Sequence, residues 1–127
     1  MGNGTSIGRV RGLGSAHSGT HHWLLQRFTA IGNLLLMAWL LVSLLLLPDF
    51  SYGTVAEWIA GPVPATAMAL LVISTFWHAR LGMQVMLEDY VHEGGNKFAA
   101  VTLLNLVVFA GAGFGLFSIF RLALGGA

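Results

Sequence analysis

Residues 34–47 read LLLMAWLLVSLLLL, a charge-free stretch that is apolar on all sides of a helix. It lies within a longer charge-free run of 21 residues, 28–48. A helix needs about 20 predominantly apolar residues to cross the hydrocarbon core of a bilayer. Two further charge-free runs, 58–79 and 98–120, contain 22 and 23 residues. The sequence therefore predicts an all-α membrane protein with three transmembrane helices.

The composition supports a membrane protein. Of the 127 residues, 56% are hydrophobic and 9% are charged, and the mean hydropathy is +0.77. An ordinary soluble domain has about 25% charged residues. The chain has no cysteine, which excludes disulfides, thiolate zinc sites and self-supplied iron–sulfur clusters. A net charge of +1 gives no reason to expect nucleic acid binding, and residues 1–127 show one domain without internal repeats.

Proline and glycine residues set the expected limits of the helices. Pro48 is expected to end the first helix, and Gly94 and Gly95 are expected to end the second. The three spans are predicted at about residues 22–47, 64–89 and 97–121. Glycines at alternate positions in the third span permit close helix contact: Gly111, Gly113 and Gly115.

The few charges predict the orientation. Cations flank one side of the spans: Arg9, Arg11, Arg27 and Lys97. The connection after the first span carries only acidic residues, and Arg121 is the one contrary cation. By the positive-inside rule the N-terminus is cytoplasmic, with residues 1–20 as a retained polar segment. The expected location is the bacterial inner membrane, or the mitochondrial inner membrane if the chain is eukaryotic.

A histidine and a carboxylate share one face of the second helix. The eleven steps from His78 to Asp89 come to about 1100°, about 20° from three whole turns, and to about 16 Å of rise. Ser74 and Gly82 lie on the same stripe. Imidazole is a usual axial ligand of haem iron, Gly82 would leave space for a flat porphyrin, and Ser74 could bond to the other ring nitrogen. An interhelical hydrogen bond for His78 and a packing role for Gly82 remain open alternatives.

Asp89 and Tyr90 form a second candidate site at the end of this helix. A tyrosine hydroxyl can donate to a carbonyl oxygen, and a neighbouring carboxylate can orient it or relay protons. These properties suit a quinone that is reduced at the membrane edge. The alternative is a plain acidic helix end with an interfacial tyrosine. His92 could join the relay or be a solvated loop residue.

The chain resembles the family of small hydrophobic membrane anchors of succinate dehydrogenase, respiratory complex II. One block of the resemblance is His78, Gly82, Gln84, Asp89 and Tyr90. The other lies in SGTHHWLLQRFTAIGN, where the matching residues are Gly19, His21, Trp23, Arg27, Thr29 and Ala30. The glycine-rich run before it is similar to alphaproteobacterial and mitochondrial-like members.

The resemblance implies specific site residues. His78 would be an axial ligand of the iron of haem b, with Ser74 and Gly82 in the haem environment. His21 and Arg27 would lie near the haem propionates, which a guanidinium fork can pair. Asp89 and Tyr90 would border the site where ubiquinone is reduced with electrons from succinate oxidation.

The resemblance also implies partners. His78 is the only histidine within an apolar span, so the second axial ligand would come from the larger anchor, the cytochrome b subunit, with which the helices would form a bundle. An iron–sulfur subunit and a flavoprotein subunit would supply electrons. The chain itself would be a subunit of the enzyme that does not oxidise succinate.

The sequence leaves three alternative functions and one conflict open. The chain could be a fumarate reductase anchor, a structural anchor without haem, or an unrelated small transporter subunit that uses His78 and Asp89 as a proton pathway. Arg80 lies about 200° from His78 and about 13 Å deep if Asp89 marks the interface. Either Arg80 snorkels, or it marks the membrane surface itself and Asp89 projects into the cytoplasm. The resemblance favours the first, deeper placement, and composition alone does not decide.

Overall fold

Four helices make up the part of the chain that the computed structural model describes, residues 19–125. They are α2 (Gly19–Leu45), α3 (Tyr52–Ala60), α4 (Pro62–Tyr90) and α5 (Gly94–Ala123). No strand occurs between residues 19 and 125, which confirms the all-α prediction for that part. The predicted polar segment 1–20 lies outside the described residues, apart from its last two.

Three of these helices are long and apolar enough to cross a membrane, as predicted. They contain 27, 29 and 30 residues in α2, α4 and α5. At about 1.5 Å of rise per residue they are roughly 40–45 Å long, against a hydrocarbon thickness of about 30 Å. Their ends therefore reach into or beyond the headgroup regions.

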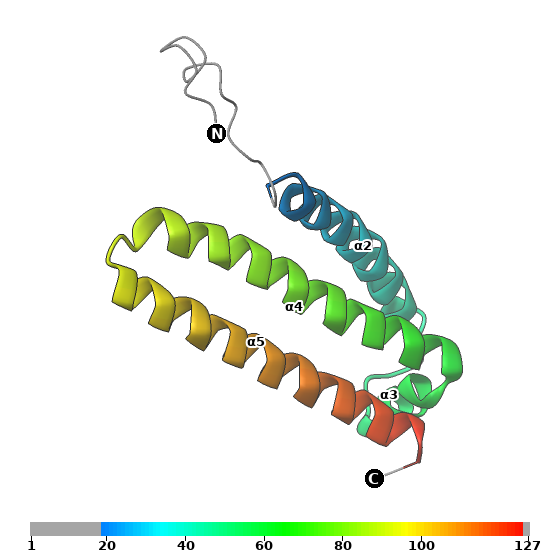
Figure 1. Ribbon diagram of the computed structural model, residues 1–127. Helices are drawn as coiled ribbons and strands as arrows, with labels where there is room; N and C mark the ends of the chain where they lie inside the picture. Colours follow the sequence, from blue (N-terminus) through cyan, green and yellow to red (C-terminus); the bar gives the residue numbers. More distant parts are fainter. Residues whose placement is uncertain (1–18, 126–127) are drawn as a thin grey trace, which may run out of the picture.

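Helix α4 lies between α2 and α5. It packs against both α2 and α5, whereas α2 and α5 are not neighbours (Figure 1). Because consecutive spans reverse direction, the C-terminal half of α4 lies beside the N-terminal halves of both other helices (Figure 1). Candidate residues near His78 can therefore meet residues from α2 on one side and from α5 on the other.

The first span, α2, ends at Leu45, shortly before Pro48, as predicted. The chain leaves α2 in a tight turn, in which the backbone N–H of Leu47 donates to the carbonyl of Leu44 at 3.2 Å. Pro48 follows directly, and it has no N–H with which to continue the helix. The next span, α4, begins at Pro62, where a missing N–H costs nothing because the first turn leaves its N–H groups unpaired.

The connection between α4 and α5 differs from the prediction. Val91 is extended, at φ −102° and ψ 105°, and its N–H closes the last turn of α4 on the carbonyl of Leu87. Gly94 and Gly95 do not break α4; they lie in the first turn of α5. Residues 91–93 alone reverse the chain, so the glycines fall where helical N–H groups have no intrahelical partner.

A short helix, α3, was not predicted. Ser51 caps it by accepting a hydrogen bond from the backbone N–H of Thr54. The carboxylate of Asp49 accepts from both the hydroxyl and the N–H of Ser51, and these bonds lower the pKa of Asp49 from its usual 3.8. The ring of Trp58 stacks on Trp39 of α2 with centroids 5.7 Å apart. Helix α3 therefore packs across the ends of the long helices (Figure 1).

Small residues bring α4 and α5 together. A Cβ atom built on Gly111 would lie 2.6 Å from Cε1 of Phe76, and one on Gly115 would lie 3.1 Å from Cγ1 of Val72. On the facing side of α4, Ala65 and Ala69 are buried. The predicted close contact through the glycines of the third span therefore involves two of the three, since Gly113 has nothing within 4 Å.

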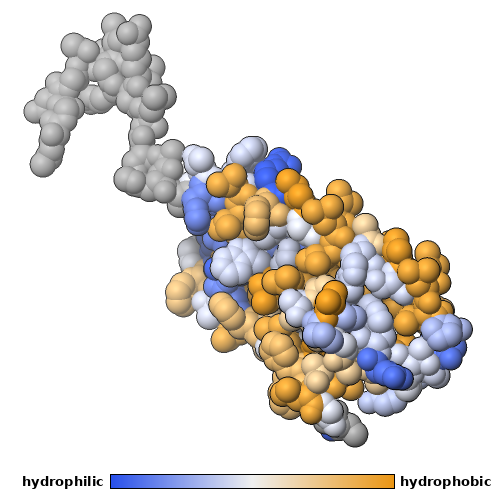
Figure 2. Space-filling view, turned by 90° about the vertical axis from the view of Figure 1, so that its right-hand side faces the viewer, coloured by the Kyte–Doolittle hydropathy of each residue, from blue (hydrophilic) through white to orange (hydrophobic). Residues whose placement is uncertain are grey.

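The outer surface is apolar, as a bilayer requires. Apolar side chains cover much of the face shown in Figure 2. Large exposed ones occur on all three spans, including Leu34 on α2, Leu70 on α4 and Phe109 on α5. In water such a surface would be a liability; in lipid or against another membrane subunit it is the expected exterior.

Candidate haem and quinone site

The centre of the candidate site is a hydrogen bond between α2 and α4. Nδ1 of His78 lies 3.0 Å from Oγ1 of Thr29. Thr29 is buried and His78 is half-buried between the two helices. Among the described residues, Nε2 of His78 has no hydrogen-bond partner. One ring nitrogen is therefore engaged by the protein and the other is available to a ligand.

Ser74 plays a different part from the one expected. The sequence suggested that Ser74 could bond to the second ring nitrogen of His78, but Thr29 occupies that position. The hydroxyl of Ser74 instead donates to the backbone carbonyl of Thr29 at 3.3 Å. The sequence could not predict the contact between Ser74 and Thr29, because the sequence of one span does not determine which of its residues lie opposite those of a neighbouring span.

A cleft lies about one helical turn from this bond, and neither Thr29 nor His78 lines it. Its volume is about 630 Å³, and it lies between the N-terminal end of α2 and the C-terminal end of α4. The lining residues are Gly19, His22, Trp23, Gln26, Arg27, Gly82, Gln84, Val85 and Glu88. Two residues expected around haem, Arg27 and Gly82, thus line the same cleft.

The histidine at the cleft is His22 rather than His21. His21 is exposed and does not line the cleft. Successive residues of a helix differ by about 100°, so only one of this pair can face α4. The guanidinium carbon of Arg27 lies 5.6 Å from the ring centroid of Trp23, a cation–π contact that holds the arginine at the cleft.

Gln26 contributes an unsatisfied polar atom. Its Oε1 is buried and has no hydrogen-bond partner among the described residues. Its Nε2 would lie 3.6 Å from a Cβ atom on Gly82, so the two residues are in contact across the seam. A buried carbonyl oxygen without a donor is rare in proteins and points to a polar partner that the chain alone does not supply.

Asp89 and Tyr90 lie at the last turn of α4, away from the cleft. Both are exposed, Tyr90 by 79%. Their neighbour Glu88 does line the cleft, and it accepts a hydrogen bond from Gln84 at 2.9 Å. The backbone carbonyl of Glu88 also accepts from the ammonium group of Lys97 on α5 at 3.3 Å. The end of α4 is thus fixed, while the Asp89–Tyr90 pair is open to another molecule.

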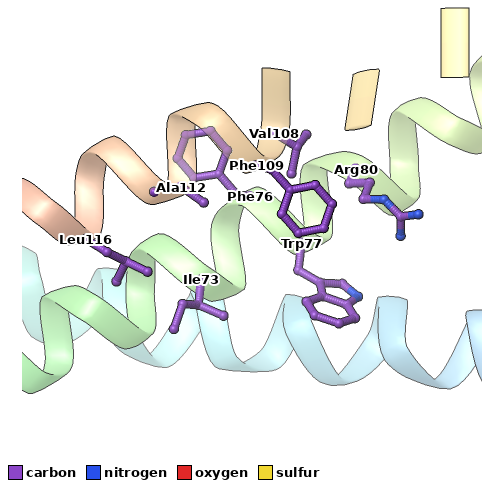
Figure 3. A pocket seen from close by; sticks show the side chains of 9 residues that line it. Ile73, Phe76, Trp77, Arg80, Val108, Phe109, Ala112 and Leu116 are labelled. Carbon is purple, nitrogen blue, oxygen red and sulfur yellow. The ribbon is translucent and has the colours of Figure 1, made fainter. Parts of the chain in front are cut away.

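Arg80 faces α5, on the side of α4 opposite His78. Its Nε donates to Oδ1 of Asn105 at 2.6 Å. It stands at one end of an apolar groove of about 310 Å³ between α4 and α5, which Phe76 and Trp77 also line (Figure 3). The Arg80 guanidinium is therefore paired with a polar acceptor through a charge-assisted hydrogen bond, whatever its depth in the membrane.

No cluster of three or more His, Cys, Asp or Glu side chains that could hold a metal ion occurs in the described part of the chain. A haem iron needs only axial ligands from the protein, and a single histidine on each of two chains provides them. The donor set present, one imidazole with a free ring nitrogen, fits one such ligand.

Comparison with known proteins gives a consistent family. Residues 1–112 match the model of the succinate dehydrogenase/fumarate reductase transmembrane subunit family. A succinate dehydrogenase hydrophobic membrane anchor subunit of Rickettsia bellii (strain RML369-C) is 40% identical over 104 residues, which cover 82% of each chain. Its counterpart in Paracoccus denitrificans is 30% identical over 117 residues, 91% of this chain and 89% of the relative. A succinate dehydrogenase membrane anchor subunit of Reclinomonas americana is 30% identical over 93 residues, 71% of this chain and 78% of the relative.

Proposed function

Because the chain belongs to the succinate dehydrogenase/fumarate reductase transmembrane subunit family, we propose that it binds haem b through His78 and helps form the site where ubiquinone is reduced. As a membrane anchor subunit of succinate dehydrogenase with three apolar spans, it is a multi-pass protein, and a bacterial inner-membrane location is consistent with its alphaproteobacterial relatives. It does not oxidise succinate itself.

The bond between His78 and Thr29 carries the haem proposal. Histidines that ligate metals usually donate their other ring N–H to a protein acceptor, and Thr29 Oγ1 lies at 3.0 Å from Nδ1. The free Nε2 of His78 would then hold the iron of haem b. The bound haem would supply an iron that can accept and return one electron. Arg27 at the cleft would pair a propionate, and the buried Oε1 of Gln26 would face a polar group there.

Other subunits complete the site. His78 is the only histidine of the described residues inside a charge-free apolar run, since His21 and His22 lie in the first turn of α2 and His92 follows α4. A second histidine ligand would therefore come from the cytochrome b subunit. An iron–sulfur subunit would deliver electrons that a flavoprotein subunit takes from succinate. The chain's lack of cysteine agrees with this division of work.

Ubiquinone would contact Asp89 and Tyr90. Reduction adds two electrons and two protons to the quinone, and negative charge develops on a carbonyl oxygen when an electron arrives. A hydrogen bond from the Tyr90 hydroxyl would stabilise that charge, and Asp89 would orient the hydroxyl or relay a proton. The exposure of Tyr90, 79%, suits a group that contacts a molecule outside this chain.

The two arginines support a shallow placement of the site. Since α2 and α4 run in opposite directions, the Thr29–His78 bond sets Arg27 and Arg80 at one level, about 3 Å further toward the cytoplasmic end. Arg80 lies about 27 Å along the helix from Pro62, close to the hydrocarbon thickness of about 30 Å. Both cations would then mark the cytoplasmic surface, with the N-terminus on that side. Asp89 and Tyr90 would project beyond it, where an attached soluble subunit would cover them.

Two alternatives within the family differ in measurable ways. A fumarate reductase anchor would have the same architecture and run the couple in reverse. A structural anchor without haem would keep the Thr29–His78 bond merely as an interhelical contact. The transporter interpretation has no support from the relatives, which are named as succinate dehydrogenase anchors.

The test compares two electron acceptors, a soluble dye and ubiquinone, in the membrane and soluble fractions of cells that lack this chain. Succinate oxidation with the dye should persist but move to the soluble fraction. Succinate-dependent ubiquinone reduction should disappear. Re-expressing the chain should restore both membrane attachment and ubiquinone reduction. Ubiquinone reduction that continues without the chain would refute its role in the quinone site.

A further inference from the structure

The hydroxyl of Thr29 has three polar neighbours but only one proton. It lies 2.8 Å from the carbonyl oxygen of Leu25, 3.1 Å from that of Gln26 and 3.0 Å from Nδ1 of His78. Both carbonyls can only accept hydrogen bonds. The two oxygens at 2.8 Å would repel one another unless the hydroxyl proton lies between them.

This count assigns the proton on the imidazole. Because Thr29 gives its proton to the carbonyl of Leu25 or Gln26, its oxygen is left as an acceptor for Nδ1 of His78. Nδ1 must therefore carry a hydrogen, and in the neutral ring Nε2 keeps the lone pair. We infer that Thr29 is a positioning residue that fixes the tautomer and the orientation of His78 so that Nε2 is the ligating atom; this inference rests on the proposed binding of haem.

Thr29 is itself held in place. The hydroxyl of Ser74 donates to its backbone carbonyl at 3.3 Å. Gly32 also lies close to Ser74, since a Cβ atom on Gly32 would be 3.4 Å from that hydroxyl oxygen. Thr29 is only 9% exposed, so water does not compete readily for its hydroxyl. The hydroxyl that accepts from His78 is thus held in place and largely shielded from solvent.

Such an acceptor has two expected effects on a bound haem. It removes the need to reorient the ring on binding, and loss of comparable outer contacts lowers metal affinity roughly 10–100-fold. It also makes the imidazole a stronger electron donor, which favours ferric iron and lowers the reduction potential. A role in helix packing alone would produce neither effect.

Three variants in the assembled complex separate these roles. Thr29→Val keeps the shape and removes the acceptor, Thr29→Ser keeps the hydroxyl, and Thr66→Val is the control. Thr66 makes the same kind of bond within its helix, to the carbonyl of Pro62 at 2.7 Å, but it is exposed and far from His78. The readouts are haem per flavin, the potentiometric midpoint of the haem and the low-spin electron paramagnetic resonance spectrum.

The expected result is a loss of haem affinity of roughly 10–100-fold and a higher midpoint in Thr29→Val, with Thr29→Ser and Thr66→Val close to the parent. If the parent complex holds haem and Thr29→Val has unchanged occupancy, midpoint and spectrum, the positioning role is wrong, and this result does not contradict haem binding by the complex. If Thr66→Val moves the readouts as much as Thr29→Val, the effect comes from the helix and the inference also fails. A fully assembled parent complex without haem would overturn both this inference and the proposed function.

Discussion

Replacing Gly111 by alanine tests the contact that holds α5 against α4. The added Cβ would lie 2.6 Å from Cε1 and 2.8 Å from Cζ of Phe76. Ordinary carbon–carbon contacts are about 3.5–4.0 Å, so the ring or the helix must retreat by roughly 1 Å. Overpacking of this kind costs about 1–3 kcal/mol of unfolding free energy.

Gly113→Ala is the matched control. It makes the same chemical change two residues along the same helix, and its Cβ would meet nothing within 4 Å. Alanine favours a helix over glycine by about 0.5–1 kcal/mol, and this gain is shared by both variants. The difference between them therefore isolates the clash, about 1–3 kcal/mol, which corresponds to roughly 5–150-fold in the unfolding equilibrium.

The assay is equilibrium unfolding of the chain in detergent micelles by titration with sodium dodecyl sulfate, followed by circular dichroism. Phe76→Leu should reduce the cost of Gly111→Ala, because the shorter side chain leaves room for the new methyl group. Equal stability of the Gly111 and Gly113 variants, within about 0.5 kcal/mol, would refute the close contact between the helices.

Three further predictions concern the polar groups. Asn105→Leu removes the acceptor of the Arg80 guanidinium and should cost about 1.5–3 kcal/mol in the same unfolding assay; an equal cost in an Arg80→Met background would contradict the pairing. The hydrogen bonds from Ser51 lower the pKa of Asp49 below 3.8, so the Asp49 carboxylate stabilises α3 above that pH, and this stabilisation is lost as the pH falls through the lowered pKa. Tryptophan fluorescence should report this transition. If the transition persists in Asp49→Asn, it belongs to another group. Tyr90→Phe should slow ubiquinone reduction by roughly 10–150-fold without changing dye reduction, and an unchanged rate in an assembled complex would remove the carbonyl-donor role.

The sequence predicted those parts of the fold that depend on the residues of a single span. Charge-free length predicts three membrane helices, because a bilayer excludes charge and demands internal hydrogen bonding. Helix α3 was missed because nine residues capped by Ser51 give a weaker signal than a full span. The role of Gly94 was misassigned, since three non-glycine residues are enough to turn the chain.

The candidate site was predictable only along α4. The spacing of His78, Gly82 and Asp89 follows from helix geometry alone. The partners Thr29 of His78 and Asn105 of Arg80 come from other helices, and their identity depends on interhelical register. A polar residue in the N-terminal half of each neighbouring span was the available signal, but it could not show which residues are in contact.

The most direct test of the central claim is a dithionite-reduced minus oxidised visible spectrum of the complex purified with this chain in mild detergent. Ligation of haem b by His78 predicts a b-type spectrum in the parent complex, and its loss or marked alteration in an assembled His78→Gln complex. An intact parent complex without a haem signal, or an unchanged spectrum in the variant, would contradict ligation by His78 and leave that residue as a contact between α2 and α4.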